Sequence, residues 1–139
     1  MSAMDLLKSM MVAASGLKAQ SGRMRIIAEN IANADSTAST PGGDPYRRKI
    51  PTFQDRLDSS IGTETVQLGR PVLDNTEFQL KYMPGHPAAD SNGYVKMPNV
   101  NALVEAMDMK EAQRSYEANL NLIQASRKMI SQTIDILKK

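Results

Sequence analysis

Apolar side chains recur at helical spacing along the N-terminal end of the chain. They lie alternately three and four residues apart over about four heptads, which predicts a long helix over residues 1–34 with a coiled-coil seam. A second, weaker apolar series at Val12, Ala19 and Ile26 lies on roughly the far side of this helix. The stretch ADSTASTPGGDP is rich in helix breakers and predicts that the helix ends near Asn33. The main seam comprises Leu7, Met10, Ala14, Leu17, Ser21, Met24, Ala28 and Ile31.

Helix-start signals occur at both ends of the chain. Ser2 and Asp5 fit the capping-box spacing at the start of the first helix. Residues 100–139 contain no Pro or Gly and predict a second long helix, which Asn99 or Asn101 can cap. The helices are much longer than those of an ordinary globular domain, which favours a coiled coil or a fibrous assembly.

The C-terminal helix carries apolar residues on two nearly opposite sides. An ordinary surface helix buries one stripe and exposes the other face to water, so this helix needs a neighbour on each side. It could be the central helix of a monomeric bundle, but the chain offers only one other long helix to surround it. The pattern therefore favours packing between molecules. The first stripe is Leu122, Ala125, Met129 and Ile136, and the second is Leu120, Ile123, Ile130, Ile134 and Leu137.

The middle segment, residues 35–99, differs in composition from both ends. It holds all seven prolines and most of the glycines, and short strand patterns occur at 46–50, 64–68 and 77–83. Its two phenylalanines can bury little surface, so we expect this segment to be mobile in a free subunit. The predicted fold is mainly α, with long N- and C-terminal helices forming a coiled coil. An irregular, β-containing insert separates residues 1–34 from residues 100–139.

Composition narrows the possible functions. The chain has no cysteine, ten methionines and few aromatic residues, which suits adaptable surfaces that become ordered against partners. A net charge of +2 is too small to indicate nucleic-acid binding. No apolar run is long enough to span a membrane, and the N-terminus lacks the basic region of a Sec signal peptide.

No pattern in the sequence predicts catalysis, a cofactor site or a metal site. The single histidine, His86, lies between two prolines without candidate partners, which favours a structural or solvent-facing role. The basic cluster at 46–49 could bind phosphate, but it lacks a wider basic field. The alternative is a strand whose charges face water or pair with a neighbouring subunit. We therefore expect no enzyme activity.

The acidic side chains at the start of the C-terminal helix allow two interpretations. They could form a metal or acid–base site. However, Lys110 and Arg114 are interleaved with them at helical spacing, which favours a solvated face of ion pairs. The carboxylates are Glu105, Asp108, Glu111 and Glu117.

Several segments resemble the flagellar rod and hook protein family. ASGLKAQ at 14–20 and IAENIANADST at 27–37 resemble its N-terminal signature, and PYRRK at 45–49 is similar to the strand start that follows. PGHPAADSNGYVKMPNVN at 84–101 and VEAMDMKEAQRSYEANLNLIQASRKMISQTIDIL at 104–137 resemble the C-terminal part of rod members. The resemblance covers about 90 of the 139 residues and is loosest at 51–83.

This resemblance implies a structural subunit of the proximal rod, in the periplasmic part of the flagellar basal body. Such proteins leave the cell by the flagellar type III apparatus without a cleaved Sec signal. The implied partners are copies of itself, other proximal and distal rod proteins, the adaptor to the MS ring and export gate, and the export apparatus in transit. The terminal helices would form the inner layer of the rod, and the insert would form an outer domain.

The same resemblance suggests which residues contact neighbouring subunits. The first stripe of the C-terminal helix would pack on the N-terminal helix, and the second on neighbours. The alternative to a rod subunit is a soluble coiled-coil adaptor or chaperone with one defined partner. The expected interface residues are Leu17, Met24, Asn30, Ile31, Asn33, Tyr116, Ala118, Asn119, Leu122, Ile123, Ala125, Met129, Ile130, Ile134 and Leu137.

Overall fold

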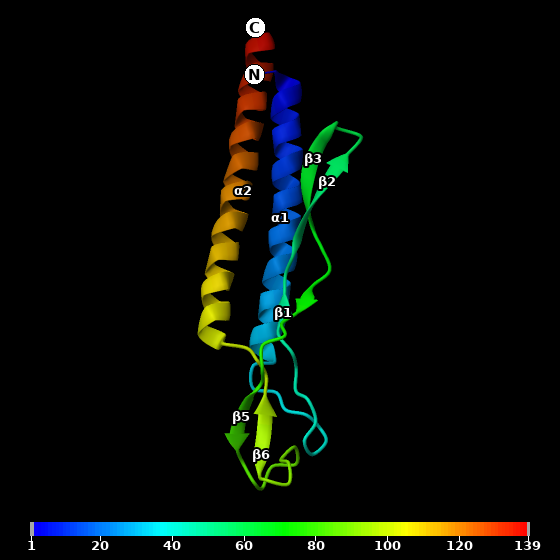
Figure 1. Ribbon diagram of the computed structural model, residues 1–139. Coiled ribbons are helices and arrows are strands. Elements are labelled where there is room, and N and C mark those ends of the chain that lie inside the picture. Colours follow the sequence, from blue (N-terminus) through cyan, green and yellow to red (C-terminus); the bar gives the residue numbers. More distant parts are fainter. Residues whose placement is uncertain (1, 139) are drawn as a thin grey trace. The chain divides into compact units, whose positions relative to one another are not determined.

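The computed structural model describes residues 2–138. Within these residues, one long helix precedes and another follows, along the chain, a middle region that contains short strands (Figure 1). Helix α1 is Ala3–Ala32 and helix α2 is Ala102–Leu137. The prediction of a mainly helical chain with a small β-containing insert is confirmed. The strands are β1 (Lys49–Ile50), β2 (Phe53–Asp58), β3 (Thr63–Leu68), β4 (Val72–Leu73), β5 (Gln79–Tyr82) and β6 (Tyr94–Met97).

The predicted helix starts are confirmed in atomic detail. The Asp5 backbone N–H donates to Ser2 Oγ at 3.1 Å, and the Ser2 N–H donates to Asp5 Oδ2 at 3.1 Å, which completes a capping box. At the start of α2, the N–H groups of Leu103 and Val104 donate to Asn101 Oδ1 at 3.0 and 3.4 Å. Asn101 is therefore the cap of α2.

The strands pair in three separate two-stranded antiparallel sheets, β1–β4, β2–β3 and β5–β6. The β2–β3 hairpin runs in register from Phe53 opposite Leu68 to Asp58 opposite Thr63. Its turn includes Gly62, whose φ of 64° lies in the left-handed region that favours glycine. Of the strand patterns in the sequence, 64–68 and 77–83 correspond to β3 and β5, whereas only the end of 46–50 forms β1.

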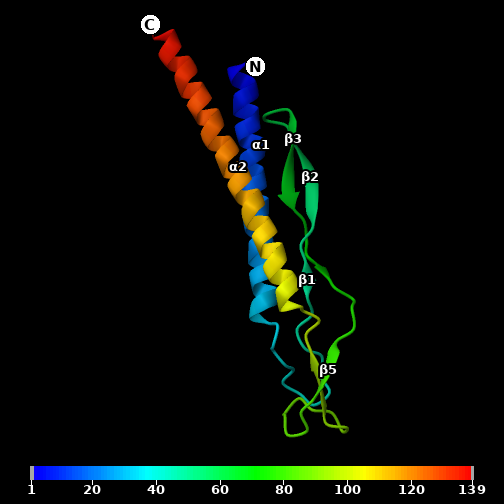
Figure 2. The ribbon, with the colours of Figure 1, turned by 90° about the vertical axis from the view of Figure 1, so that its left-hand side faces the viewer.

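The chain divides into two compact units, each of which contains part of both helices. The first unit comprises the chain up to Met24, Thr52–Gly69 and the chain from Lys110 onward. The second unit comprises Arg25–Pro51 and Arg70–Met109. In the first unit, α1 and α2 run antiparallel and the β2–β3 hairpin lies beside α1 (Figures 1 and 2).

Close approach in the first unit depends on two glycines of α1. A Cβ at Gly16 would lie 2.8 Å from Nδ2 of Asn119 on α2, and a Cβ at Gly22 would lie 2.6 Å from Cδ2 of Leu68 on β3. Ser15 Oγ also accepts a hydrogen bond of 3.3 Å from the backbone N–H of Val66. One face of α1 therefore meets α2 and another meets the hairpin, and small residues allow both contacts.

Few large apolar side chains are buried within residues 2–138. Most of the buried apolar residues are alanines, and the largest fully buried side chains are Ile27, Glu105, Val95 and Asn30. Two of these four are polar, so burial of apolar surface contributes less here than in a typical domain of this length. The remaining apolar surface of the helices stays in contact with solvent in the single subunit.

Candidate assembly interface

The main apolar seam predicted on α1 is largely uncovered in the single subunit. Leu7 and Ile31 are 46% and 40% exposed, whereas Ala19 and Ile26 of the weaker series are buried. The chain thus buries Ala19 and Ile26 of the weaker series and leaves much of the main seam exposed. Among the predicted interface residues of α1, Leu17, Met24 and Asn33 are half-buried, Ile31 is exposed and Asn30 is buried.

The two stripes of α2 also differ in exposure, in the reverse of the expected order. Leu122 and Met129 of the first stripe are 48% and 51% exposed, whereas Ile123 and Ile130 of the second are half-buried. The expectation that the first stripe packs on the N-terminal helix is therefore wrong for the single subunit. Of the other predicted residues, Tyr116 and Asn119 are half-buried, and Ala118, Ala125, Ile134 and Leu137 are exposed.

Direct contacts between the helices in the first unit are small or polar. Besides the approach of Gly16 to Asn119, Arg23 Nη2 lies 3.4 Å from Glu111 Oε2. The Glu111 side chain is 70% exposed, so this pair contributes at most about 1 kcal/mol. Neither contact covers the exposed stripes, and exposed apolar surface of this kind is typical of interaction sites.

The second unit is organised around the buried side chain of Asn30 at the end of α1. Asn30 Oδ1 accepts hydrogen bonds from the Tyr46 hydroxyl at 2.6 Å and from the Lys49 backbone N–H at 3.0 Å. Its Nδ2 donates to the Lys49 carbonyl at 2.8 Å and to Glu105 Oε2 at 3.3 Å. The amide thus uses both acceptor sites and both N–H groups, which compensates for its complete burial.

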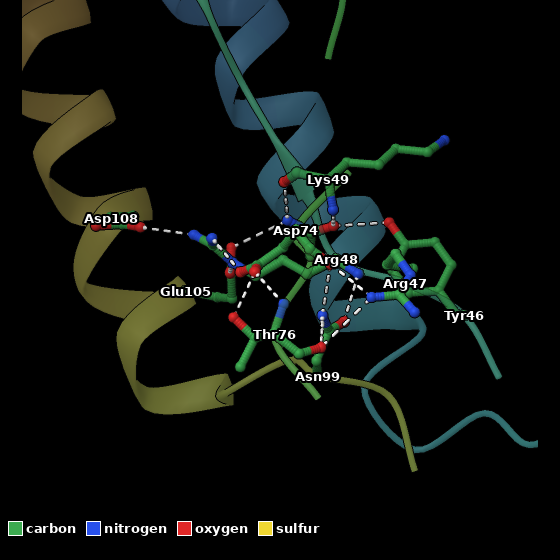
Figure 3. Close-up of polar contacts among 10 residues, drawn as sticks. Tyr46, Arg47, Arg48, Lys49, Asp74, Thr76, Asn99, Glu105 and Asp108 are labelled. Atoms are coloured by element: carbon green, nitrogen blue, oxygen red, sulfur yellow. Dashed lines mark hydrogen bonds and ion pairs between the residues drawn. The ribbon is translucent and has the colours of Figure 1, made fainter. Parts of the chain in front are cut away.

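Arg48 contacts three acidic side chains (Figure 3). One of them is Glu105, which also accepts a hydrogen bond from Asn30. Arg48 Nε donates to Glu105 Oε1, and its Nη1 donates to Asp74 Oδ2 at 3.3 Å. Its Nη2 lies 3.6 Å from Asp108 Oδ2. Glu105 is completely buried on the first turn of α2, so Arg48 supplies the charge that balances a carboxylate removed from water.

A second layer of hydrogen bonds joins β1, β4 and the segment before α2. Asn99 Oδ1 accepts from the Arg48 backbone N–H at 2.7 Å, and Asn99 Nδ2 donates to the carbonyls of Asp74 and Thr76 at 2.9 and 3.0 Å. The Arg47 guanidinium lies 4.3 Å from the centre of the Phe78 ring and donates to the Asp74 carbonyl at 2.8 Å. Asn99 therefore joins the residue before β1 to the residues after β4 and does not cap α2.

The surroundings of this cluster shift three pKa values. Burial, followed by the negative charges of Glu29 and Glu105, raises the pKa of Tyr46 to about 12. Hydrogen bonds from Thr76, with help from Arg48, hold the pKa of Asp74 below its ordinary value. Burial alone would lower the pKa of Arg48, but bonding to Glu105 and Asp74 raises it. The Arg48 guanidinium is therefore engaged within the chain.

The structure changes the interpretation of both charged clusters. Lys49 Nζ lies 2.6 Å from Glu29 Oε1, so Arg48 and Lys49 pair within the subunit, and this arrangement does not support phosphate binding. Glu105 is buried, so it does not belong to the solvated face that helical spacing predicts. His86 Nδ1 accepts from the Ala88 backbone N–H at 3.0 Å, within its own loop.

The described residues, 2–138, offer neither a metal-ligand cluster nor a membrane-spanning helix. Among these residues, no group of three or more His, Cys, Asp or Glu side chains could hold a metal ion. None of the helices described is both long and apolar enough to cross a bilayer. The exposed apolar surface of the two helices is the main candidate for a functional site among the described residues.

Two family models match the two ends of the chain. The model described as "Flagella basal body rod protein" matches residues 10–38. The model described as "Flagellar basal body rod FlgEFG protein C-terminal" matches residues 91–136. The matched segments contain most of α1 and nearly all of α2, together with Asn30 and Glu105. They define the class as a rod protein of the flagellar basal body.

Curated relatives are similar to the chain over nearly its full length. The flagellar basal-body rod protein FlgC of Agrobacterium fabrum is 55% identical, and the alignment covers 91% of each chain. The protein of the same name from Salmonella typhimurium is 40% identical over 96% of this chain and 98% of its own length. That from Borreliella burgdorferi is 40% identical over 97% and 99%. The chain belongs to the FlgC family of flagellar basal-body rod proteins.

Proposed function

We propose that the chain is a self-assembling subunit of the proximal rod, which transmits torque across the periplasm through its two terminal helices. The observation that carries this proposal is the exposure of apolar residues on both helices of a single subunit. Leu122 and Met129 on α2 and Ile31 on α1 are each 40% exposed or more. Neighbouring subunits would cover these residues and would complete a coiled-coil-like packing of the helices.

The proposed contacts include exposed and half-buried residues of both helices. On α1 they comprise Leu17, Met24, Ile31 and Asn33. Asn30, which is buried within the chain, positions the end of α1 and does not face a neighbour. Residues 35–99 would form an outer domain around the two helices, which occupy residues 1–34 and 100–139. On α2 the contacts comprise Tyr116, Ala118, Asn119, Leu122, Ile123, Ala125, Met129, Ile130, Ile134 and Leu137.

The proposed partners follow from membership of the family. They are other copies of the chain, the other proximal rod proteins, the distal rod protein and the adaptor that joins the rod to the MS ring and export gate. Before assembly the chain would pass through the flagellar export apparatus, without a cleaved Sec signal. Helix ends that are stable only against neighbours suit such a passage, because folding is then coupled to assembly.

Leu122→Asp tests the proposed interface. Leu122 is already half exposed, so we expect the isolated variant to unfold at nearly the same urea concentration as the wild type. In cells that lack the wild-type gene, the variant should abolish rod assembly and swimming, because a charge would be buried between subunits. Gln124→Asp, an exposed change on the same helix outside the stripe, is the matched control and should leave swimming intact.

Two results would contradict the proposal. Normal swimming by cells with Leu122→Asp would remove the first stripe of α2 from the assembly interface. A purified wild-type chain that forms a closed, stable oligomer, with helicity independent of dilution, would favour a soluble adaptor or chaperone instead. Circular dichroism over a dilution series, together with light scattering, measures this directly.

A further inference from the structure

Glu105 carries a buried carboxylate that is not part of the proposed assembly interface. It lies in the second unit, on the first turn of α2, and none of its surface reaches solvent. Its two oxygens are bound by Arg48 Nε and by Asn30 Nδ2. A carboxylate is costly to bury, so the burial of Glu105 requires an explanation in terms of the fold.

Stability alone is a weak explanation for this ion pair. Removing two charges from water costs several kcal/mol per ion, and replacing a buried pair by well-packed apolar residues is often neutral or stabilising. The best-attested use of a buried polar group in helix packing is to specify one register among several. A group that specifies register must join separate segments, and the Glu105 carboxylate does so in the second unit.

Three separate segments meet at the Glu105 carboxylate. Asn30 comes from the end of α1, Arg48 immediately precedes β1, and Glu105 comes from the start of α2. Hydrogen bonds are directional, whereas apolar contacts between alanines and methionines tolerate sliding and rotation. A shift of α2 by one residue turns its side chains by about 100° and would leave Glu105 without both partners.

We propose that the Arg48–Glu105 pair, with Asn30, specifies the register of the start of α2 against β1 and the end of α1. The pair selects one arrangement of the second unit and is not required for the stability of that unit. The two apolar stripes of α2, at residues 120–137, lie in the first unit, so they do not fix the start of α2 within the second unit.

A set of three variants separates specificity from stability. Arg48→Met leaves a buried carboxylate without its cation and should raise the equilibrium constant for unfolding on the order of a hundredfold or more. Glu105→Leu removes the carboxylate and should have a smaller effect, because Arg48 keeps Asp74 and Asp108. The double variant Arg48→Met/Glu105→Leu should recover stability to within about tenfold of the wild type.

The register is measured in the isolated chain by dipolar electron paramagnetic resonance. The chain has no cysteine, so spin labels on Ala28→Cys and Ala106→Cys, both exposed in the second unit, are specific. The wild type should give one narrow distance, and the double variant a broad or divided distribution at similar stability. The neighbouring, more exposed pair Lys49–Glu29 provides the control: Lys49→Met/Glu29→Leu should keep the narrow distance.

Three outcomes would overturn the inference. A double variant with one narrow distance at recovered stability would mean that the pair carries no register information. A double variant no more stable than Arg48→Met would mean that the pair is needed for folding. A wild type without a single distance would mean that no register exists before assembly.

Discussion

The side-chain amide of Asn30 pairs with both backbone polar groups of Lys49, as the backbone of a neighbouring strand would. The Lys49 N–H donates to Asn30 Oδ1 at 3.0 Å, and the Lys49 carbonyl accepts from Asn30 Nδ2 at 2.8 Å. On the opposite side of this short strand, the Arg48 carbonyl accepts from the Asp74 N–H at 2.9 Å. The strand β1 therefore lies between β4 and a single side chain of α1.

Asn30→Ala should destabilise the second unit more than an ordinary helix-end substitution. The change leaves the Lys49 N–H and carbonyl and the Tyr46 hydroxyl without their partner, so we expect a loss of about 2–4 kcal/mol in the free energy of unfolding. Urea denaturation of the purified chain measures this loss. Asn33→Ala is the matched control, because Asn33 Nδ2 bonds only to the Glu29 carbonyl of the same helix, and its cost should stay below about 1 kcal/mol. Equal costs for the two variants would contradict the strand-like role of Asn30.

Tyr46 should make the second unit sensitive to alkaline conditions. Its pKa is raised to about 12 in the folded chain from an ordinary value of 10.0, so the folded state holds the phenolic proton more tightly than the unfolded state. The stability that this group contributes is complete below pH 10 and is lost as the pH rises toward 12. Tyr46→Phe should therefore flatten the pH dependence of unfolding in this interval. An unchanged slope between pH 10 and 12 would contradict this assignment of the alkaline transition.

The termini of the helices could be predicted because their signals are local. Ser2 with Asp5, and Asn101, carry the information for each helix start within a few residues. The burial of Glu105 could not be predicted in this way. Lys110 and Arg114, farther along the same helix, suggest a solvated face of ion pairs, whereas the true partner of Glu105, Arg48, is 57 residues away in the sequence.

The apolar pattern of α1 does not by itself decide which side of the helix the chain buries, for a physical reason. Hydrophobic periodicity gives weight to Leu7 and Ile31, which remain exposed in the single subunit. The chain instead packs α1 through residues small enough to let a neighbour approach, among them Gly16 and Gly22. Periodicity measures apolar character and does not measure how closely two backbones can approach.

Asp74 should make the second unit sensitive to acid. Its pKa is lowered, first by hydrogen bonds from Thr76 and then by Arg48, so the folded state favours the ionised carboxylate. The resulting stability is complete above the ordinary value of 3.8 and is lost as the pH falls through the lower folded pKa. Thr76→Val keeps the charge but removes the hydroxyl donor, and it should weaken the acid dependence of unfolding below pH 4. An acid transition as steep as that of the wild type would show that Asp74 does not contribute to it.

Gly16 and Asn119 should be coupled in the first unit. Alanine is favoured over glycine inside a helix by about 1 kcal/mol, but a Cβ at Gly16 would lie 2.8 Å from Asn119 Nδ2 and 3.1 Å from its Cγ. Gly16→Ala alone should therefore give little or no gain in the free energy of unfolding, because the Asn119 side chain must move. In Gly16→Ala/Asn119→Ala the obstacle is absent, and most of the gain should return.

A double-mutant cycle by urea denaturation measures this coupling, with Asn119→Ala as the second single variant. Ser21→Ala, at an exposed position of α1, reports the effect of helix propensity without a close neighbour. We expect a coupling of about 0.5–1 kcal/mol between positions 16 and 119. If Gly16→Ala stabilises the chain fully on its own and the cycle closes without coupling, α1 and α2 do not approach each other at this point in solution. The close approach would then have to arise only when neighbouring subunits press the two helices together.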